Sequence, residues 1–262
     1  MLNLIIKIYR ILFGRTALYR FNRTVYLCSL RGMGILNYES DRLSGEEHFI
    51  QKYLSVQKGG VVLDVGANIG EYSSRVLKTN PSLSVYAFEP HPKTFSILKD
   101  AIKHPNFLAV NAAVGSEKGS AELFDYASND GSAHASLFKD VIERTHLAPS
   151  MRHQVDVITL SDFVRDHEIS HISLLKLDTE GNELNALKGI KDLIQAGAID
   201  LIHFEFNEMN VSSKTFFRDF WDILPNYGLY RLLPDGMIKL EEYSSLYCEI
   251  FAYQNIVAIL KK

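Results

Sequence analysis

Short apolar runs alternate with amphipathic stretches through most of the chain. The runs are rich in Val, Ile, Leu and Phe, which predicts buried strands at 61–65, 85–88, 107–110, 172–177 and 199–206. The stretches at 71–79, 93–103 and 182–196 have helical spacing, and a further helix at 45–56 precedes the first strand. Strands that alternate with helices predict an α/β fold, with a doubly wound, mostly parallel sheet covered on both faces.

Two other regions depart from this alternation. A short strand at 121–124 is followed by a polar loop at 127–132 with the residues of a turn. Near the end of the chain the pattern predicts an aromatic-rich helix at 216–224 and antiparallel strands around 229–233 and 250–260.

The first 23 residues combine a very apolar helix with five basic side chains and no acid. Lys7 and Arg10 lie on one narrow polar stripe of this helix. They interrupt what would be a signal-peptide core, and no small-residue cleavage site follows, so we expect no export. Two interpretations remain open: residues 1–23 bind the surface of an anionic membrane, or they pack against the domain or a second subunit of a homo-oligomer.

Composition narrows the class of protein. A chain of 262 residues, nearly half hydrophobic, is long enough for one large α/β domain with an extension. The net charge of −3 gives no basic footprint for nucleic acid. The two cysteines, Cys28 and Cys248, supply neither a disulfide framework nor a thiolate metal site, so we expect a cytoplasmic protein. We expect no membrane-spanning segment, because no apolar stretch is long enough.

A glycine-containing loop follows the strand at 61–65. Gly66 and Gly70 allow a sharp turn and a close approach of a ligand to the backbone. The next strand ends in Glu89 and Pro90, and a carboxylate at that point of a βαβ unit can accept both hydroxyls of a ribose. The combination indicates a nucleoside-bearing cofactor.

The loop also indicates which cofactor is bound. Asn68 stands where a dinucleotide loop needs a glycine that lets a pyrophosphate lie against the backbone. Asp64 would repel a pyrophosphate, but it can pair with the ammonium group of an amino acid attached to a nucleoside. S-adenosyl-L-methionine has this chemistry.

Four segments carry a resemblance to a known family: 63–70, 88–90, 111–115 and 175–183, of which the last, Leu-Lys-Leu-Asp-Thr-Glu-Gly-Asn-Glu, is the most specific. Through them the chain resembles the FkbM-type S-adenosylmethionine-dependent methyltransferases over roughly residues 59–210. The resemblance implies a Rossmann-like seven-stranded sheet, the class I methyltransferase fold. It also implies methyl transfer, usually to a hydroxyl of a sugar or of a complex natural product.

Position by position, the resemblance implies that the glycine loop holds the methionine part, Glu89 the ribose, and Asn111 with Ala112 the adenine edge. Ser73 stands where the family often has Thr, which keeps the hydroxyl. The residues expected to bind the cofactor are Asp64, Gly66, Ala67, Asn68, Gly70, Tyr72, Ser73, Glu89, Pro90, Asn111, Ala112 and Asp178.

The acceptor side needs a group that aligns the acceptor oxygen with the methyl and a group that takes its proton. Asp178 ends a central strand, where open α/β sheets place their ligands, and Glu180 follows on the loop. Asp178 can take the proton or hold the donor's amino group, and its alternative role is to cap the helix at Asn182. Lys176 shares a strand face with Asp178, which allows an ion pair.

His203 and Glu205 lie two apart on the next strand, so both side chains point to the same face. His203 is a candidate general base and Glu205 a candidate partner of a sugar hydroxyl, whereas a structural role for a buried histidine remains open. Asp178, Glu180, His203 and Glu205 are thus the candidate catalytic residues. An arrangement of these four around a divalent metal is a further alternative, although the spacing shows no dedicated metal cage.

We therefore expect a methyltransferase that acts on a hydroxyl of a sugar in a glycan, polysaccharide or glycolipid. Residues 1–45 would form the amphipathic helix and linker, and residues 46–262 the methyltransferase domain. We expect the protein in the cytoplasm, with membrane contact on the inner face as one interpretation. His134 lies in a loop expected to cover the site, where it is either part of a lid or an ordinary surface residue. Two alternatives remain: a nucleotide-dependent oxidoreductase or epimerase, and a non-catalytic S-adenosylmethionine-binding module.

Overall fold

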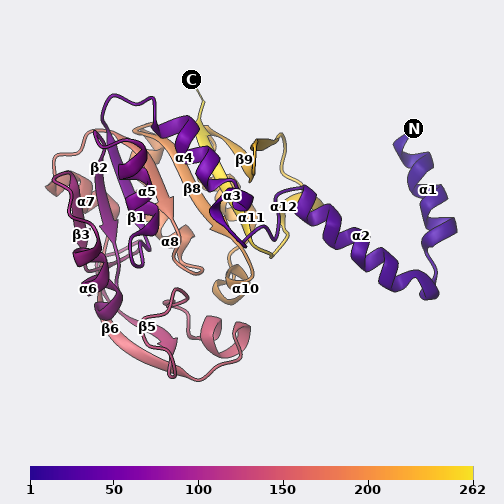
Figure 1. The fold of residues 1–262 in the computed structure, drawn as a ribbon, viewed down its shortest axis with the longest axis horizontal. Coiled ribbons are helices and arrows are strands. Elements are labelled where there is room, and N and C mark those ends of the chain that lie inside the picture. The colour runs from indigo at the N-terminus through magenta and orange to yellow at the C-terminus, as the bar shows by residue number, and fades with distance from the viewer. Residues whose placement is uncertain (262) are drawn as a thin grey trace.

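The computed structural model describes residues 1–261, and eight strands form its central sheet (Figure 1). In order across the sheet these are β10 (Gly236–Leu240), β9 (Tyr227–Leu233), β11 (Gln254–Leu260), β8 (Ile199–Phe206), β7 (Ile172–Leu177), β1 (Val61–Val65), β2 (Ser84–Phe88) and β3 (Phe107–Val110). Strands β3, β2, β1, β7 and β8 run parallel, and β11 is antiparallel to β8 and β9. The expected α/β fold is confirmed. The sheet has one strand more than seven because β10 folds back on β9 as a tight hairpin.

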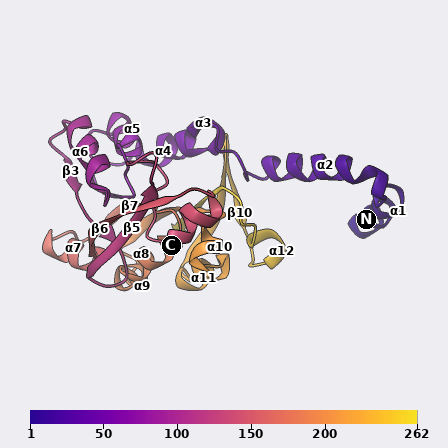
Figure 2. The ribbon, with the colours of Figure 1, turned by 90° about the horizontal axis from the view of Figure 1, so that it is seen from below.

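Helices cover both faces of the sheet, as the alternating pattern predicts (Figure 2). One face carries α4 (Glu46–Leu54), α5 (Glu71–Thr79) and α6 (Pro92–Ala101), and the other carries α7 (Leu160–Asp166), α8 (Glu183–Lys188), α9 (Lys191–Gln195) and α11 (Phe217–Ile223). The single helix expected at 182–196 is divided into α8 and α9. The division falls at Gly189, where a Cβ would lie 2.1 Å from the carbonyl oxygen of Gly115, so the chain approaches a neighbouring loop too closely for a side chain.

A second, three-stranded sheet lies beside the carboxyl ends of the main strands (Figure 1). It consists of β4 (Ala113–Val114), β6 (Ser150–Ile158) and β5 (Gly119–Tyr126). The predicted strand at 121–124 is the middle of β5. The sequence pattern missed β6 because Arg152, Gln154 and Asp156 expose polar side chains along it, which leaves no continuous apolar run. The π-helix η2 (Val141–Thr145), which lies between β5 and β6 in the chain, and its spatial neighbour α10 (Met209–Ser213), which follows β8, complete this part of the molecule.

The N-terminal segment projects from the body as two helices (Figure 1). The first helix, α1 (Leu2–Phe13), has no buried residue, and η1 (Thr16–Leu18) leads to α2 (Tyr19–Gly32), in which only Leu30 is buried. The helix α2 extends to Gly32, so much of the segment 1–45 expected to hold a helix and a linker is helical. The chain joins the body at Ile35, which is fully buried and bridges Gln254. Two short helices, α3 (Asp41–Ser44) and α12 (Ser245–Cys248), lie nearby. Within residues 1–261, no helix combines the length and apolar character needed to cross a membrane.

Candidate active site

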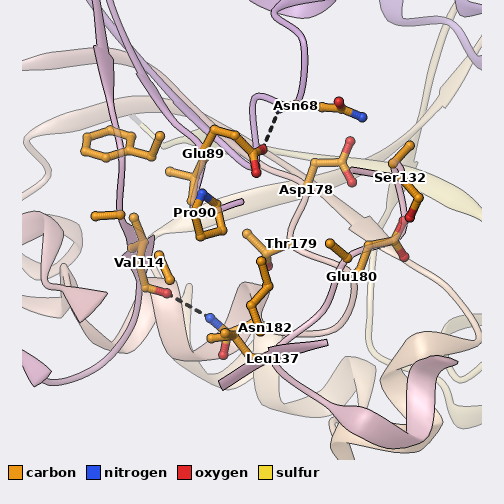
Figure 3. A pocket seen from close by; sticks show the side chains of 18 residues that line it. Asn68, Glu89, Pro90, Val114, Ser132, Leu137, Asp178, Thr179, Glu180 and Asn182 are labelled. Atoms are coloured by element: carbon orange, nitrogen blue, oxygen red, sulfur yellow. Dashed lines mark hydrogen bonds between the residues drawn. The ribbon is translucent and has the colours of Figure 1, made fainter. Parts of the chain in front are cut away.

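Two adjoining clefts open where the strands β1, β2, β7 and β8 end. The first cleft is drawn in Figure 3, and its lining includes Val65, Phe88, Glu89, Pro90, Ala112, Val114, Ser132, Leu137, Thr179, Glu180 and Asn182. The lining of the second cleft includes Tyr38, Glu46, Asp64, Ala67, Tyr72, Arg75, Lys176, Glu205 and Tyr253. Gly66, Asn68, Ala133 and Asp178 line both clefts, so the two meet at these four residues.

The turn after β1 brings two strand ends together. Gly66 has a φ of +81°, and a Cβ on it would lie 1.7 Å from the carbonyl oxygen of Asp178. Only glycine combines this conformation with so close an approach. Gly70 serves packing instead, because its nearest neighbours are Leu98 and Ile102 of the α6 region, and it lines neither of the two clefts.

The carboxylate of Glu89 lies against the glycine loop. The backbone N–H of Asn68 donates to Glu89 Oε2 at 2.9 Å (Figure 3). The backbone N–H of His91 donates to Glu89 Oε1 at 2.8 Å. Burial raises the pKa of Glu89 to about 7. Asn111 does not line the first cleft: its side-chain amide donates to the carbonyl oxygens of Glu89 and Pro90 and so braces this turn from behind.

The turn after β7 is organised by Glu183. One oxygen of this buried carboxylate accepts bonds from the backbone N–H of Thr179, the Thr179 hydroxyl and the N–H of Gly181, at 2.8, 2.9 and 3.1 Å. The N-cap of α8 is Asn182, so the alternative of Asp178 as a helix cap does not apply. The side chain of Asp178 instead faces the two clefts (Figure 3).

A buried lysine holds the carboxylates of the second cleft together. The Nζ of Lys176 lies 3.5 Å from Glu46 Oε1, 3.5 Å from Asp178 Oδ2 and 4.0 Å from Glu205 Oε1. The possible ion pair of Lys176 with Asp178 is therefore confirmed. Burial lowers the pKa of Lys176, but these three carboxylates outweigh burial and hold it well above its usual value. Burial and the charge of Asp178 raise the pKa of Glu205 well above its ordinary range.

Asp64 lies on β1 beneath this cluster. The hydroxyl of Ser73, on α5, donates to Asp64 Oδ2 at 2.6 Å. Burial raises the pKa of Asp64 to about 6, so the carboxylate is ionised at neutral pH. Ser73 itself is fully buried and lines neither cleft, so it acts on the site through Asp64.

His203 is enclosed rather than open to either cleft. Its Nε2–H donates to Asn255 Oδ1 at 2.9 Å, because that oxygen can only accept, and its Nδ1 therefore accepts from the hydroxyl of Tyr72 at 3.2 Å. Burial and the charge of Lys176 lower the pKa of His203 well below its usual value. This neutral imidazole orients Tyr72, which lines the second cleft.

The loop between β5 and β6 reaches over the first cleft. His134 Nδ1 lies 3.1 Å from Glu180 Oε1, and the hydroxyl of Ser136 donates to the carbonyl oxygen of Glu180 at 2.8 Å. Burial raises the pKa of Glu180 to about 7. The hydrogen bond between His134 and Glu180 raises the pKa of His134. His134 thus has the position expected of a lid residue.

The structure brings together most of the residues predicted from sequence. Asp178, Glu180 and Glu205 line the clefts, and the ligand atoms of these three and His203 do not converge on one metal position among the described residues. Sequence reasoning missed Glu46, Tyr38 and Tyr253, because they lie outside the strand–helix alternation. It also missed Arg75, one turn beyond Tyr72 on α5, because the partners of Arg75 are Asp41 and Glu46, which are far from it in sequence.

This sheet order, with an antiparallel strand between two parallel ones, and a cleft at the first strand–helix turn define an S-adenosylmethionine-dependent methyltransferase with a Rossmann-like fold. The family match agrees with this class. The Methyltransferase FkbM domain matches residues 64–232, and the chain belongs to this family. The cofactor is S-adenosylmethionine, and the alternatives of an oxidoreductase and of a non-catalytic module are not supported.

Three relatives show the breadth of the family. Methyltransferase 1 of Beauveria bassiana is 29% identical over 56% of this chain and 68% of its own length. The 31-O-demethyl-FK506 methyltransferase FkbM of Streptomyces tacrolimicus is 29% identical over 55% of this chain and 64% of its own length. The hexuronic acid methyltransferase AglP of Haloferax volcanii is 28% identical over 59% of this chain and 60% of its own length. The match thus spans less than two thirds of the latter two proteins.

Proposed function

We propose that this methyltransferase acts on a hydroxyl oxygen of a sugar unit in a glycan, polysaccharide or glycolipid. The observation that carries the proposal is the second cleft, which adjoins the cofactor cleft and is lined by carboxylates and tyrosines. Its volume of about 500 Å³ lies in the range of small-molecule sites. The names of two relatives support this choice, since one denotes methylation of an oxygen and the other of a hexuronic acid.

On the donor side, we assign the ribose to Glu89 and the amino group of the methionine part to Asp64 and Asp178. The free lone pairs of Glu89 face the first cleft while two backbone N–H groups hold its oxygens in place. Asp64 is ionised at neutral pH, as pairing with an ammonium requires. When bound, S-adenosylmethionine supplies an electrophilic methyl group on a sulfonium.

Asp178 has the position of an aligning group, because it lines both clefts and its carboxylate is held by Lys176. In-line displacement requires the acceptor oxygen to lie where the clefts meet. For the proton we favour Glu180, since its pKa of about 7 suits a general base near neutral pH. His134, on the lid loop, orients the Glu180 carboxylate.

His203 and Glu205 receive different roles in this proposal. His203 holds the hydroxyl of Tyr72 and has no direct path to the acceptor, so it is a positioning residue. Burial and the charge of Asp178 raise the pKa of Glu205, which favours its protonated form, and in that form Glu205 can donate a hydrogen bond to an acceptor oxygen.

The lining of the second cleft favours a neutral sugar. Even without Glu205, the acidic residues of the lining outnumber the cations of Arg75 and Lys176, so an anionic acceptor would be repelled. These acidic residues are Asp41, Glu46, Asp64, Glu71 and Asp178. Carboxylates are good acceptors for sugar hydroxyls. At the mouth, the rings of Tyr38 and Tyr253 lie 6.0 Å apart edge to face, and the apolar face of a sugar ring can pack against them.

Residues 1–23 support a location of the acceptor at a membrane. The helix α1 exposes Leu4, Ile5, Ile8 and Ile11 by roughly half or more of their surface and carries basic residues but no acid. We propose peripheral binding of this helix to the inner face of an anionic membrane, where a glycolipid acceptor would be presented. Packing of the same helix against a second subunit is the alternative outcome.

The experiment is an acceptor screen that follows S-adenosylhomocysteine formation with neutral glycolipids, hexuronate-containing glycans and non-sugar alcohols. We expect turnover with a neutral sugar and a several-fold higher KM in Tyr38→Ala. The matched control is Tyr247→Ala, which removes a similarly exposed tyrosine that does not line the cleft. Turnover confined to non-sugar alcohols, or a KM in Tyr38→Ala equal to that of the control, would overturn the proposal.

A further inference from the structure

Two histidines and an aspartate converge at one point outside the two clefts. His91 Nε2 lies 2.9 Å and His153 Nε2 2.8 Å from the same oxygen, Asp130 Oδ1. The three candidate ligand atoms all lie within 4.8 Å of one another. The residues come from three separate segments: the turn after β2, the loop after β5 and the strand β6.

The geometry is close to that of a metal site with two imidazole ligands and one carboxylate. Ligand atoms bound about 2.0–2.1 Å from a tetrahedral zinc lie roughly 3.3 Å apart, so each imidazole nitrogen needs to move only a few tenths of an ångström away from Asp130 Oδ1. The Nε2–H of His91 donates to Asp130 Oδ1, because a carboxylate oxygen accepts. The Nδ1 of this fully buried ring has no hydrogen-bond partner, so it can take the ring proton when a metal ion binds Nε2.

The neighbouring carboxylate of Asp125 has a different task. Its oxygens accept from the backbone N–H groups of Tyr126, Gly131 and Ser132 at 2.7 to 2.9 Å, which folds the loop that carries Asp130. Asp125 Oδ2 lies 3.6 Å from His91 Nε2, too far for a hydrogen bond. Asp125 therefore supplies negative charge beside the cluster and shapes the loop, and three ligands remain.

We propose that His91, Asp130 and His153 bind a divalent first-row transition-metal ion, with zinc as the leading candidate. A set of two imidazoles and one carboxylate favours such an ion over Mg²⁺ or Ca²⁺, which prefer oxygen ligands alone. The site lies apart from the methyl-transfer residues, and the proposal does not depend on the identity of the acceptor.

The ion would connect the cofactor cleft with its lid. The backbone N–H of His91 donates to Glu89, so a ligand on the His91 ring stabilises the turn that holds this carboxylate. Asp130 precedes Ser132 and Ala133, which line the first cleft. A metal bound to both segments would fix the loop after β5 against the end of β2. The expected consequence is a higher cofactor affinity with the metal than without it.

The direct test is calorimetric titration of zinc chloride into untagged, chelator-treated full-length protein. We expect one ion per chain, and at least tenfold weaker binding in Asp130→Asn and in His153→Gln. The control is His171→Gln, because His171 forms a similar pair with Asp200 at 2.9 Å but has no third ligand. Circular dichroism checks the fold, and if one variant fails to fold, the other decides.

Two results would overturn the site: no zinc binding by the wild type, or equal affinity in the ligand variants and in His171→Gln. A second titration, of S-adenosylhomocysteine into zinc-loaded and metal-free protein, tests the role. We expect a several-fold tighter dissociation constant with zinc. An unchanged constant would overturn the connection between the ion and the lid loop, whatever the result for the site itself.

Discussion

Replacement of Glu89 by alanine tests the donor side of the proposed site. The change removes the carboxylate assigned to the ribose hydroxyls and leaves the N–H groups of Asn68 and His91 without their partner. Hydrogen bonds to a charged group contribute about 1.5–3 kcal/mol net. Since 1.4 kcal/mol corresponds to a factor of ten, the dissociation constant of S-adenosylhomocysteine should rise roughly 10- to 150-fold.

The pKa of Glu89 adds a pH dependence to this prediction. Burial raises it to about 7, and ribose hydroxyls donate more strongly to the ionised carboxylate than to the acid. Bound cofactor should therefore favour loss of the proton, and affinity should increase as pH rises from about 6 to about 8. The variant Glu89→Ala should lose this dependence above about pH 7, whereas the ionisation of Asp64, whose pKa is about 6, still acts at lower pH.

Isothermal titration calorimetry with the wild type, Glu89→Ala and Glu122→Ala provides the assay. Glu122 is a suitable control because it is an exposed residue of β5 that pairs with Arg152 and lines neither cleft. An unchanged dissociation constant in a folded Glu89→Ala protein would refute the assignment of the ribose. A pH dependence of affinity that persists in Glu89→Ala between about pH 7 and 8 would show that a group other than Glu89 titrates there.

Three further predictions address the base, the turn and the N-terminus. If Glu180 takes the proton, kcat should rise with pH through about 7, and Glu180→Gln should remove this rise. His134→Ala should move the rise to higher pH, because it removes a hydrogen bond that lowers the pKa of Glu180. A kcat profile unchanged in both variants would exclude the pair. Gly66→Ala should lower the free energy of unfolding in urea by at least about 2 kcal/mol, because residue 66 has a positive φ and a Cβ there would meet the Asp178 carbonyl. The control Gly119→Ala should change the stability little, because there is open space around Gly119. Equal stabilities of the two variants would contradict the turn geometry. Deletion of residues 1–20 should abolish sedimentation with anionic vesicles, and sedimentation of the wild type should weaken with salt; a wild type that stays in the supernatant at low salt would favour the packing interpretation.

The sequence predicted the centre of the sheet well because the central strands β1, β7 and β8 are buried on both faces. The run 172–177, for example, is fully buried in β7, and such a run reads as a strand without knowledge of its neighbours. The strand β6 escaped prediction because the exposed residues Arg152, Gln154 and Asp156 alternate with its inward residues and leave no continuous apolar run. The break at Gly189 also escaped, since it depends on contact with a loop far away in sequence.

The candidate site divides in the same way. Gly66, Glu89 and Asp178 follow the ends of strands, so their place at the edge of the sheet can be inferred from local sequence alone. The enclosure of His203 cannot, because its partners Tyr72 and Asn255 come from α5 and β11. The spacing of two residues along a strand shows that His203 and Glu205 share a face of β8. Whether other elements bury that face depends on the tertiary fold, which the local sequence does not show.

The central claim is that donor and acceptor meet at Asp178 and that a sugar hydroxyl receives the methyl group. The most direct measurement uses S-adenosylmethionine labelled in the methyl group, a neutral glycolipid, and mass spectrometry with nuclear magnetic resonance of the product. We predict a label on a sugar oxygen with the wild type and at least a hundredfold slower transfer with Asp178→Ala. Label on any other type of atom, or near-normal transfer by Asp178→Ala, would contradict the claim.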